Sequence, residues 1–317
     1  MGEKEPMRVT VLLGGRSAER EVSLNTGAQV AAALASRDFA VSTVDTGEAG
    51  FIERIVASAP DVVFIALHGR FGEDGTIQGL LELLDLPYVG SGVMASAVAM
   101  NKVMTKHVYA TYGLTTPTYQ VVRRSEPFDI EEITDALGPH TVVKPANEGS
   151  SVGMTIVADP ASLRDAIDVA FGFDPLVLVE RFEEGVEVTV GVIGDDEPVA
   201  LPTLEIVPVH DFYDYESKYM PGMSRHIIPA GVSQEARTEC QRLAVEAHRA
   251  LGCSGMSRSD TIVTPQGSVF LLETNTIPGM TKTSLLPDAA AAAGIGFPEL
   301  CERLVGLGLE SWKARRG

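Results

Sequence analysis

The chain has 317 residues, of which 45% are hydrophobic and 21% are charged, a composition that fits a folded globular protein and excludes a largely disordered one. Its 25 basic and 43 acidic side chains give a formal net charge of −18. This charge repels phosphate backbones and anionic lipid, so we expect neither a nucleic-acid partner nor a membrane partner. The amino-terminal residues lack the apolar run of a signal peptide, so we expect a cytoplasmic protein.

The first hundred residues alternate strand and helix patterns. Apolar runs predict strands at 9–13, 41–44 and 61–67, and helices are predicted at 51–57 and at 23–34, the latter capped by Ser23. This order predicts a parallel sheet covered by helices, a fold of the α/β class. Ligands of such sheets bind beyond the carboxyl ends of the strands, where Gly14-Gly15 and His68-Gly69 lie.

The rest of the chain has a more antiparallel, α+β character. A long helix is predicted at 96–112, ended by Gly113, and a domain boundary is expected near residue 100. Strands are predicted at 141–145, 154–157, 176–180 and 187–193, a helix at 160–170, a polar aromatic loop at 210–230, a helix at 233–251 and a strand pair around 264–267. The sequence therefore predicts three domains, at 1–100, 101–187 and 188–317.

A glycine-rich segment at 68–75 follows the buried strand at 61–67 and precedes an apolar helix. Its glycines permit close backbone approach, and a helix start favours a polar or anionic substrate, so we interpret it as a binding loop. The GxGxxA pattern at 90–95 lacks the acidic residue that a nicotinamide site needs. The P-loop pattern is absent, so both of these nucleotide sites are excluded.

The segment 144–153 places Lys144 at the end of a strand, followed by glycines and serines. Backbone N–H groups in such a loop form a cradle for anions, and the lysine adds positive charge, so we predict a phosphate-binding loop rather than a flexible hairpin. Glu180 and Glu187 end one strand and begin the next. They are placed to accept hydrogen bonds from ribose or an exocyclic amine, although a solvated acidic turn fits equally well.

A strand pair late in the chain carries a polar set. If residues 264–267 form a tight turn, Asp260 faces Leu271 and Arg258 faces Glu273. Since side chains alternate along a strand, one face then holds Arg258, Asp260, Glu273 and Asn275. Oxygen ligands of this kind suit Mg²⁺ shared with substrate phosphates, so we predict a metal site rather than a surface ion pair. A one-residue slip of the register would scatter the set.

Two further segments complete the predicted site. Gly279 offers a backbone N–H within the constrained segment 274–281 and is a candidate donor to an oxyanion. The loop at 212–219 carries tyrosines and a lysine, and we interpret it as an active-site lid, with an interface or packing loop as the alternative.

Together these segments resemble the D-alanine–D-alanine ligases of the ATP-grasp superfamily. The resemblance runs from Val9 to about Leu304 and rests on the segments 14–23, 68–75, 144–153, 213–219 and 273–280. It implies an ATP-grasp fold preceded by a parallel-sheet domain, with ATP clamped between the sheets of the second and third domains. One departure is Ser259, where an apolar residue is expected. By alternation Ser259 points away from the metal set, so local packing is the property in question.

The resemblance also implies roles for individual residues. Nucleotide contacts would come from Lys102, Lys144, Ser151, Glu180, Phe182, Glu187 and Lys218. Two Mg²⁺ ions, replaceable by Mn²⁺, would be held by Asp260, Glu273 and Asn275. The D-alanines would be bound by Glu19, His68 and Ser284. Ser150 and Tyr219 would link the central loop to the lid, and Arg258 and Gly279 would stabilise the oxyanion.

The implied chemistry is the ATP-dependent joining of two D-alanines through an acyl phosphate, for peptidoglycan precursors. The alternatives are a related carboxylate–amine ligase, a D-alanine–D-lactate ligase, and a non-catalytic nucleotide-binding protein. The last would be expected to lack Arg258 or a metal ligand, and the sequence retains both. The expected partners are D-alanine and ATP, and the resemblance suggests a homodimer formed through the first domain.

Overall fold

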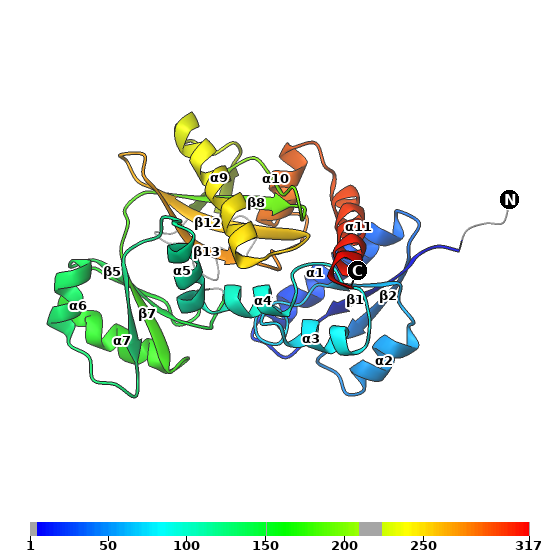
Figure 1. Ribbon diagram of the computed structural model, residues 1–317, viewed down its shortest axis with the longest axis horizontal. Coiled ribbons are helices and arrows are strands. Elements are labelled where there is room, and N and C mark those ends of the chain that lie inside the picture. The colour runs from blue at the N-terminus through cyan, green and yellow to red at the C-terminus, as the bar shows by residue number, and fades with distance from the viewer. Residues whose placement is uncertain (1–4, 150, 209–223, 317) are drawn as a thin grey trace.

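The computed structural model describes residues 5–149, 151–208 and 224–316. Within them, three sheets are arranged along the long axis of the molecule. Figure 1 shows the first sheet at one end, the second at the other and the third between them. The mixture of a parallel sheet and two antiparallel sheets confirms the predicted combination of α/β and α+β character.

The first sheet is parallel, as predicted. Its strands are β1 (Arg8–Leu13), β2 (Ala40–Asp45) and β3 (Val62–Ile65), in the order β2-β1-β3. The helices of this part are α1 (Arg20–Ala35), α2 (Phe51–Ala57) and α3 (Thr76–Leu83). The predicted cap at Ser23 is wrong because α1 begins almost one turn earlier. The buried Ser23 hydroxyl instead donates to Ala66 O at 2.6 Å, which ties the helix to the strand end.

The single helix predicted at 96–112 is also wrong, since the structure has two helices, α4 (Val93–Met100) and α5 (Lys102–Thr111). Asn101 separates them with an extended backbone, φ −88° and ψ 102°, and its side chain accepts a hydrogen bond from Met104 N at 2.9 Å. The asparagine therefore caps α5, and Lys102 opens a helix instead of lying within one.

The second sheet is antiparallel, in the order β4-β7-β5-β6. Its strands are β4 (Tyr119–Arg123), β5 (Thr141–Pro145), β6 (Thr155–Val157) and β7 (Leu176–Arg181). The sequence predicted all of them except β4. Helices α6 (Ile130–Leu137) and α7 (Leu163–Phe171), the latter preceded by a short 3₁₀ turn (Pro160–Ser162), pack over an apolar core of this sheet.

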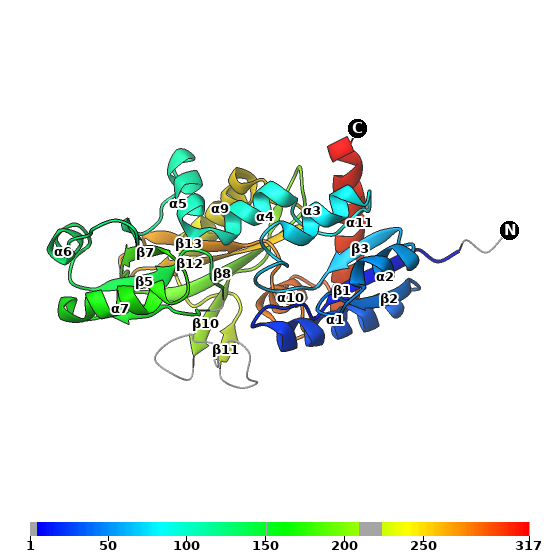
Figure 2. The same cartoon turned by 90° about the horizontal axis from the view of Figure 1, so that it is seen from below.

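The third sheet is antiparallel, in the order β11-β10-β8-β12-β13, with β9 paired to β8. Its strands are β8 (Val186–Ile193), β9 (Val199–Ala200), β10 (Leu204–Pro208), β11 (Ser224–Ile227), β12 (Met256–Val263) and β13 (Val269–Asn275). Strand β11 corrects the loop predicted over 210–230, because its residues pair with β10. Figure 2 shows α9 (Gln234–Leu251) on one side of this sheet and α10 (Leu285–Ala292) on the other.

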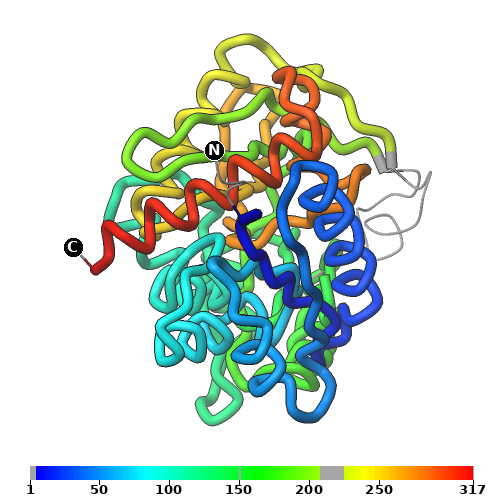
Figure 3. The backbone as a smooth tube through the Cα atoms, turned by 90° about the vertical axis from the view of Figure 1, so that its right-hand side faces the viewer, coloured from blue at the N-terminus to red at the C-terminus, as the bar shows by residue number. Residues whose placement is uncertain are grey.

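The last helix, α11 (Phe297–Arg316), returns to the first sheet. Its buried Leu300 and Leu304 share one apolar cluster with Val9 and Val30 of the first hundred residues. Figure 3 shows this helix lying across the amino-terminal part of the chain. None of the helices in the described ranges is both long and apolar enough to cross a bilayer.

Candidate active site

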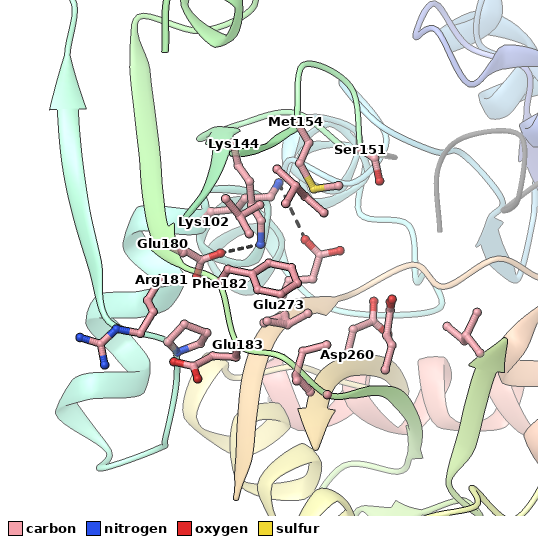
Figure 4. A pocket seen from close by; sticks show the side chains of 18 of the residues that line it. Lys102, Lys144, Ser151, Met154, Glu180, Arg181, Phe182, Glu183, Asp260 and Glu273 are labelled. Atoms are coloured by element: carbon pink, nitrogen blue, oxygen red, sulfur yellow. Dashed lines mark hydrogen bonds and ion pairs between the residues drawn. The ribbon is translucent and has the colours of Figure 1, made fainter. Parts of the chain in front are cut away.

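A cavity of about 450 Å³ lies between the second and third sheets. Residues from both sheets and from the loops that join them line it (Figure 4). Eight residues of the predicted site are among those that line it: Lys102, Lys144, Ser151, Glu180, Phe182, Glu187, Asp260 and Glu273. Residues that are far apart in the sequence thus meet at one cavity, as the resemblance implies for a nucleotide clamp.

Lys144 reaches this cavity from the end of β5. Its Nζ lies 2.5 Å from Glu180 Oε2 on the neighbouring strand β7, a contact drawn in Figure 4. Burial alone lowers the pKa of Lys144, but the negative charges of Glu180 and Glu273 outweigh it and raise the pKa above its ordinary value. Lys144 is therefore a charged ammonium group at the cavity wall, as the phosphate prediction requires.

Glu180 is 1% exposed and accepts contacts from two lysines. Oε2 faces Lys144, and Oε1 forms an ion pair with Lys106 of α5. Burial raises the pKa of this carboxyl, but the two ammonium groups reverse that effect and hold the pKa below its ordinary value. Glu180 is thus a buried anion and not part of a solvated acidic turn, and its contact with ribose or an exocyclic amine stays a prediction.

The sequence interpretation missed Lys106. Its ammonium group also donates hydrogen bonds to Thr116 Oγ1 and, at 3.4 Å, to Leu271 O of β13. Burial lowers the pKa of Lys106, and the contact with Glu180 opposes this. The signal that points to it is its position one helical turn after Lys102, since residues four apart share a face of a helix.

Lys102 approaches the same cavity from the start of α5. Its backbone N donates to Ala146 O at 2.9 Å, and its Nζ donates to the backbone oxygen of Glu148. The Nζ also lies 3.9 Å from Glu273 Oε2, so this lysine connects Glu148, in the loop 144–153, to the third sheet (Figure 4).

The register predicted for the strand pair is wrong by two residues at the site. Asp260 pairs with Glu273 and Arg258 with Asn275, whereas Asp260 was expected to face Leu271. The turn contributes one residue of this shift, because Val263 pairs with Val269, and a β-bulge after Asp260 contributes the other. Two one-residue shifts restore the alternation, so the polar set still projects from one face.

Asp260 lies at the centre of this set and is 6% exposed. It accepts hydrogen bonds from Arg258 Nε at 2.9 Å and Nη2 at 2.7 Å, from the Thr189 hydroxyl at 2.5 Å and from Asn275 Nδ2 at 3.3 Å. This carboxylate is therefore fixed in direction by three neighbours.

These donors fit a divalent cation that is shared with a phosphate. Asp260, Glu273 and Asn275 offer two carboxylates and one amide oxygen, which leave much of an octahedral shell for phosphate oxygens and water. Nowhere in the part of the chain that the structure describes do three or more His, Cys, Asp or Glu side chains form a group able to hold a metal. Two carboxylates and one amide oxygen suit a metal that arrives with the nucleotide.

Ser259 points away from the cavity, as alternation predicts. Its hydroxyl lies 2.8 Å from Thr274 Oγ1, which lies 2.7 Å from the Tyr109 hydroxyl. A polar residue is accommodated here because these hydroxyls satisfy one another, so the packing questioned above is intact.

A second predicted group lies where the first sheet meets the loop 144–153. His68 is 6% exposed, with Nδ1 3.6 Å from Glu73 Oε1 and Nε2 3.1 Å from the Thr26 hydroxyl. Burial raises the pKa of Glu73, although His68 opposes this. A methyl group added at Gly69, where φ is +67°, would lie 2.7 Å from Glu19 Oε2, so only glycine fits beside this carboxylate.

Glu19 also lies next to the loop 144–153. A methyl group added at Gly149 would be 3.5 Å from its Oε2, so the first sheet and the loop meet at this carboxylate. In the segment before α10, a methyl group at Gly279 would lie 2.9 Å from Ser284 Oγ, and that hydroxyl accepts a hydrogen bond from Thr281 N at 3.1 Å. The structure therefore brings Gly279 and Ser284 together before α10.

Three predicted residues, Ser150, Lys218 and Tyr219, lie outside the described residues, as does the predicted lid at 212–219. Arg181 adjoins Glu180 in sequence but points away from it in Figure 4. Its Nε donates to Leu137 O at 3.1 Å.

The fold and the cavity together define an ATP-grasp protein, in which two antiparallel sheets enclose a site for a nucleotide. Among solved structures, the chain is similar to the D-alanine–D-alanine ligase of Bacillus anthracis complexed with ATP. The TM-score is 0.85 and the identity 30%, over 98% of this chain and 99% of that one. The D-alanine–D-alanine ligase of Coxiella burnetii gives a TM-score of 0.85 at 28% identity, over 99% and 97% of the two chains.

Sequence comparisons give the family. The model described as D-ala D-ala ligase C-terminus matches residues 108–306, and the model described as D-ala D-ala ligase N-terminus matches residues 49–91. A D-alanine–D-alanine ligase of Pelotomaculum thermopropionicum is 48% identical over 316 residues, which cover 98% of this chain and 99% of the relative. One from Geobacter sulfurreducens is 49% identical, over 96% and 94% of the two chains. The chain belongs to the D-alanine–D-alanine ligase family.

Proposed function

We propose that this protein joins two D-alanine molecules into D-alanyl-D-alanine with cleavage of ATP to ADP and phosphate, for peptidoglycan precursors. The observation that carries the proposal is that Lys102 and Lys144 meet Asp260 and Glu273 at one cavity between two sheets. The lysines supply positive charge for phosphates, and the acidic residues supply oxygen ligands for the accompanying cation.

We infer the orientation of the nucleotide from the residues that line the two parts of the cavity. Phe182 and Glu187 line the part next to the β7–β8 connection and would contact adenine and ribose. Lys102 and Lys144 lie nearer the glycine-rich loop and would contact the phosphates. Mg²⁺ or Mn²⁺, in two sites at Asp260, Glu273 and Asn275, would neutralise charge on the transferred phosphoryl group.

In the first step, a carboxylate oxygen of one D-alanine attacks the γ-phosphorus and the bond to the ADP oxygen breaks. The product is an acyl phosphate, which supplies the leaving group that a carboxylate lacks. Glu19 would hold the ammonium group of this D-alanine, with His68 close by. Glu19 lies beside Gly149 of the loop 144–153 that would hold the phosphates, so substrate and nucleotide would approach each other there.

In the second step, the amine of the other D-alanine attacks the acyl carbon. The tetrahedral intermediate carries a negative oxygen, which then returns its electrons as phosphate leaves and the amine loses a proton. Arg258 and the Gly279 N–H would stabilise that oxygen, and a single donor of this kind contributes about 3–4 kcal/mol in other enzymes. Ser284, beside Gly279, would bind the carboxylate of the attacking D-alanine.

A coupled assay of ADP release tests the substrates. The purified protein is given ATP and Mg²⁺ with D-alanine, L-alanine, glycine, or D-alanine together with D-lactate, and the product is identified by mass spectrometry. We expect ADP release with D-alanine and formation of the dipeptide. Turnover only with another acid would replace the substrate assignment, and a mixed depsipeptide formed in preference would favour the D-lactate alternative.

Two further properties belong to this proposal. We propose that the protein acts in the cytoplasm as a homodimer formed through the first domain, with domain boundaries near residues 100 and 187. Light scattering at several protein concentrations would test the dimer, and a monomer at all concentrations would contradict it.

A further inference from the structure

Lys106, which the family resemblance leaves without a role, shares Glu180 with Lys144. It is 1% exposed, lies on α5 and is not among the residues that line the cavity. Its ammonium group contacts one oxygen of Glu180, and Lys144 contacts the other. One buried carboxylate therefore faces two buried ammonium groups.

Within this group of three residues, the arrangement leaves one positive charge in excess. A single carboxylate neutralises the charge of one ammonium group. Lys106, which does not line the cavity, neutralises the charge of Glu180. Lys144, which lines the cavity, then keeps its charge for an incoming anion. Without Lys106, Lys144 and Glu180 would form a closed neutral pair, and a lysine held in such a pair attracts a phosphate much less.

The other contacts of Lys106 fix its position. Its Nζ donates to the Thr116 hydroxyl and to Leu271 O, and that hydroxyl itself donates to Leu271 O at 2.7 Å. Leu271 belongs to β13 of the third sheet, two residues before Glu273, whereas Glu180 belongs to the second sheet. Lys106 therefore lies where the two walls of the cavity meet, and it cannot move toward the nucleotide itself.

From this geometry we propose that Lys106 is a positioning residue for ATP. It acts as the permanent counter-ion of Glu180, and so releases Lys144 to bind the nucleotide phosphates. The inference rests on the proposed function, since it assumes that phosphates bind beside Lys144.

The test separates the phosphate contribution to binding from the rest of nucleotide binding. Dissociation constants for ADP and for adenosine are measured by calorimetry in the presence of Mg²⁺. The ratio of the adenosine constant to the ADP constant reports what the phosphates add. In Lys106→Met we expect this ratio to fall about tenfold, the loss of one charge-assisted contact. We also expect the KM for ATP to rise while the KM for D-alanine stays unchanged.

Two variants show whether charge is the cause. Thr116→Val removes a hydrogen-bond partner of Lys106 but keeps its charge, so the ratio should remain that of the unmodified protein. In a Glu180→Gln background no carboxylate remains to hold Lys144, so adding Lys106→Met should leave the ratio unchanged. The comparison of Glu180→Gln with the double variant also tests the inference if Lys106→Met alone does not fold, because the double variant buries no unpaired carboxylate.

Two results would overturn the inference: an unchanged ratio in folded Lys106→Met, or an equal fall of the ratio in the Glu180→Gln background. A protein that binds ADP and ligates D-alanine but shows either result retains the proposed function and loses only this inference. Failure of the unmodified protein to bind ADP at all would instead contradict the proposed function.

Discussion

Asp260 and Glu273 lie directly opposite each other on β12 and β13 because β13 carries one extra residue, Leu272, which shifts the pairing of the two strands by one. On the turn side of this bulge, Thr261 pairs with Leu271, and on the other side Asp260 pairs with Glu273. The bulge therefore brings the two carboxylates together, and Leu272 itself lines the cavity beside them. Bulges next to active sites often re-aim side chains in this way.

Insertion of one alanine after Leu272 should cost far more than truncation of Leu272. If the bulge keeps a single extra residue, the insertion moves Glu273 from opposite Asp260 to opposite Ser259, on the other face of the sheet, so we expect loss of Mg²⁺-dependent ADP release. Leu272→Ala keeps the register and should retain most of the activity. Both variants are compared by the coupled assay and by circular dichroism. Equal activities in the two proteins would show that the bulge does not position the metal ligands.

Glu273→Ala should remove Mg²⁺-dependent turnover without unfolding the chain, because it removes one of the predicted metal ligands from a half-buried position. The assay is repeated over a range of Mg²⁺ and Mn²⁺ concentrations, and folding is checked by thermal unfolding. Glu126→Ala, which removes an exposed carboxylate of the second domain, serves as the matched control. Unchanged activity in Glu273→Ala would count heavily against the metal assignment.

Glu19→Gln should raise the KM for D-alanine and leave the dissociation constant of ADP unchanged. The carboxylate lies beside Gly69 and Gly149, and we place the ammonium group of the first D-alanine there. Loss of one charge-assisted contact predicts an increase of about tenfold or more. Glu21→Gln, on an exposed position of the same helix, is the control and should change neither constant. An equal effect on ADP binding would place Glu19 in the nucleotide site instead.

His248 should make the fold less stable in acid. Burial lowers its pKa to about 4, against the weaker opposing charge of Asp195, and its Nδ1 lies 2.8 Å from the Ser257 hydroxyl. The unfolded chain takes up the proton first as the pH falls, so the stability that neutral His248 contributes is complete above about pH 6.5 and is lost toward pH 4. The full shift corresponds to about 3 kcal/mol.

Urea unfolding of the unmodified protein and of His248→Gln at pH 7, 5.5 and 4 measures this contribution. The difference between their free energies of unfolding should shrink as the pH falls. His107 is exposed, so the free energy of unfolding of His107→Gln should change with pH as that of the unmodified protein does. A constant difference for His248→Gln at all three pH values would contradict the assignment.

The sequence predicted those features of the site that depend on alternation. Arg258, Asp260, Glu273 and Asn275 share a face in both the predicted and the observed register, because the two registers differ by an even number of residues. The bulge that contributes one of these two residues has no glycine or proline to mark it, so the sequence did not reveal it. Similarly, the break at Asn101 was hidden within a continuous helical pattern, although asparagine is a good cap.

Contacts between distant segments were the hardest to predict. Lys106 meets Glu180 only because α5 packs where the second and third sheets join, and no spacing in the sequence relates the two residues. Strand β4 was missed as well, since its apolar pattern is short and only one of its residues, Val122, is fully buried. Motifs thus predicted which residues surround the cavity, whereas the packing decides which of them touch.

The return of α11 to the first sheet has a consequence for synthesis of the chain on the ribosome. Leu300 and Leu304 fill a core that also contains Val9 and Val30, so the earliest strands keep an uncovered apolar face until the final helix has been translated. Nascent chains that stop short of α11 would expose that face to chaperones and proteases.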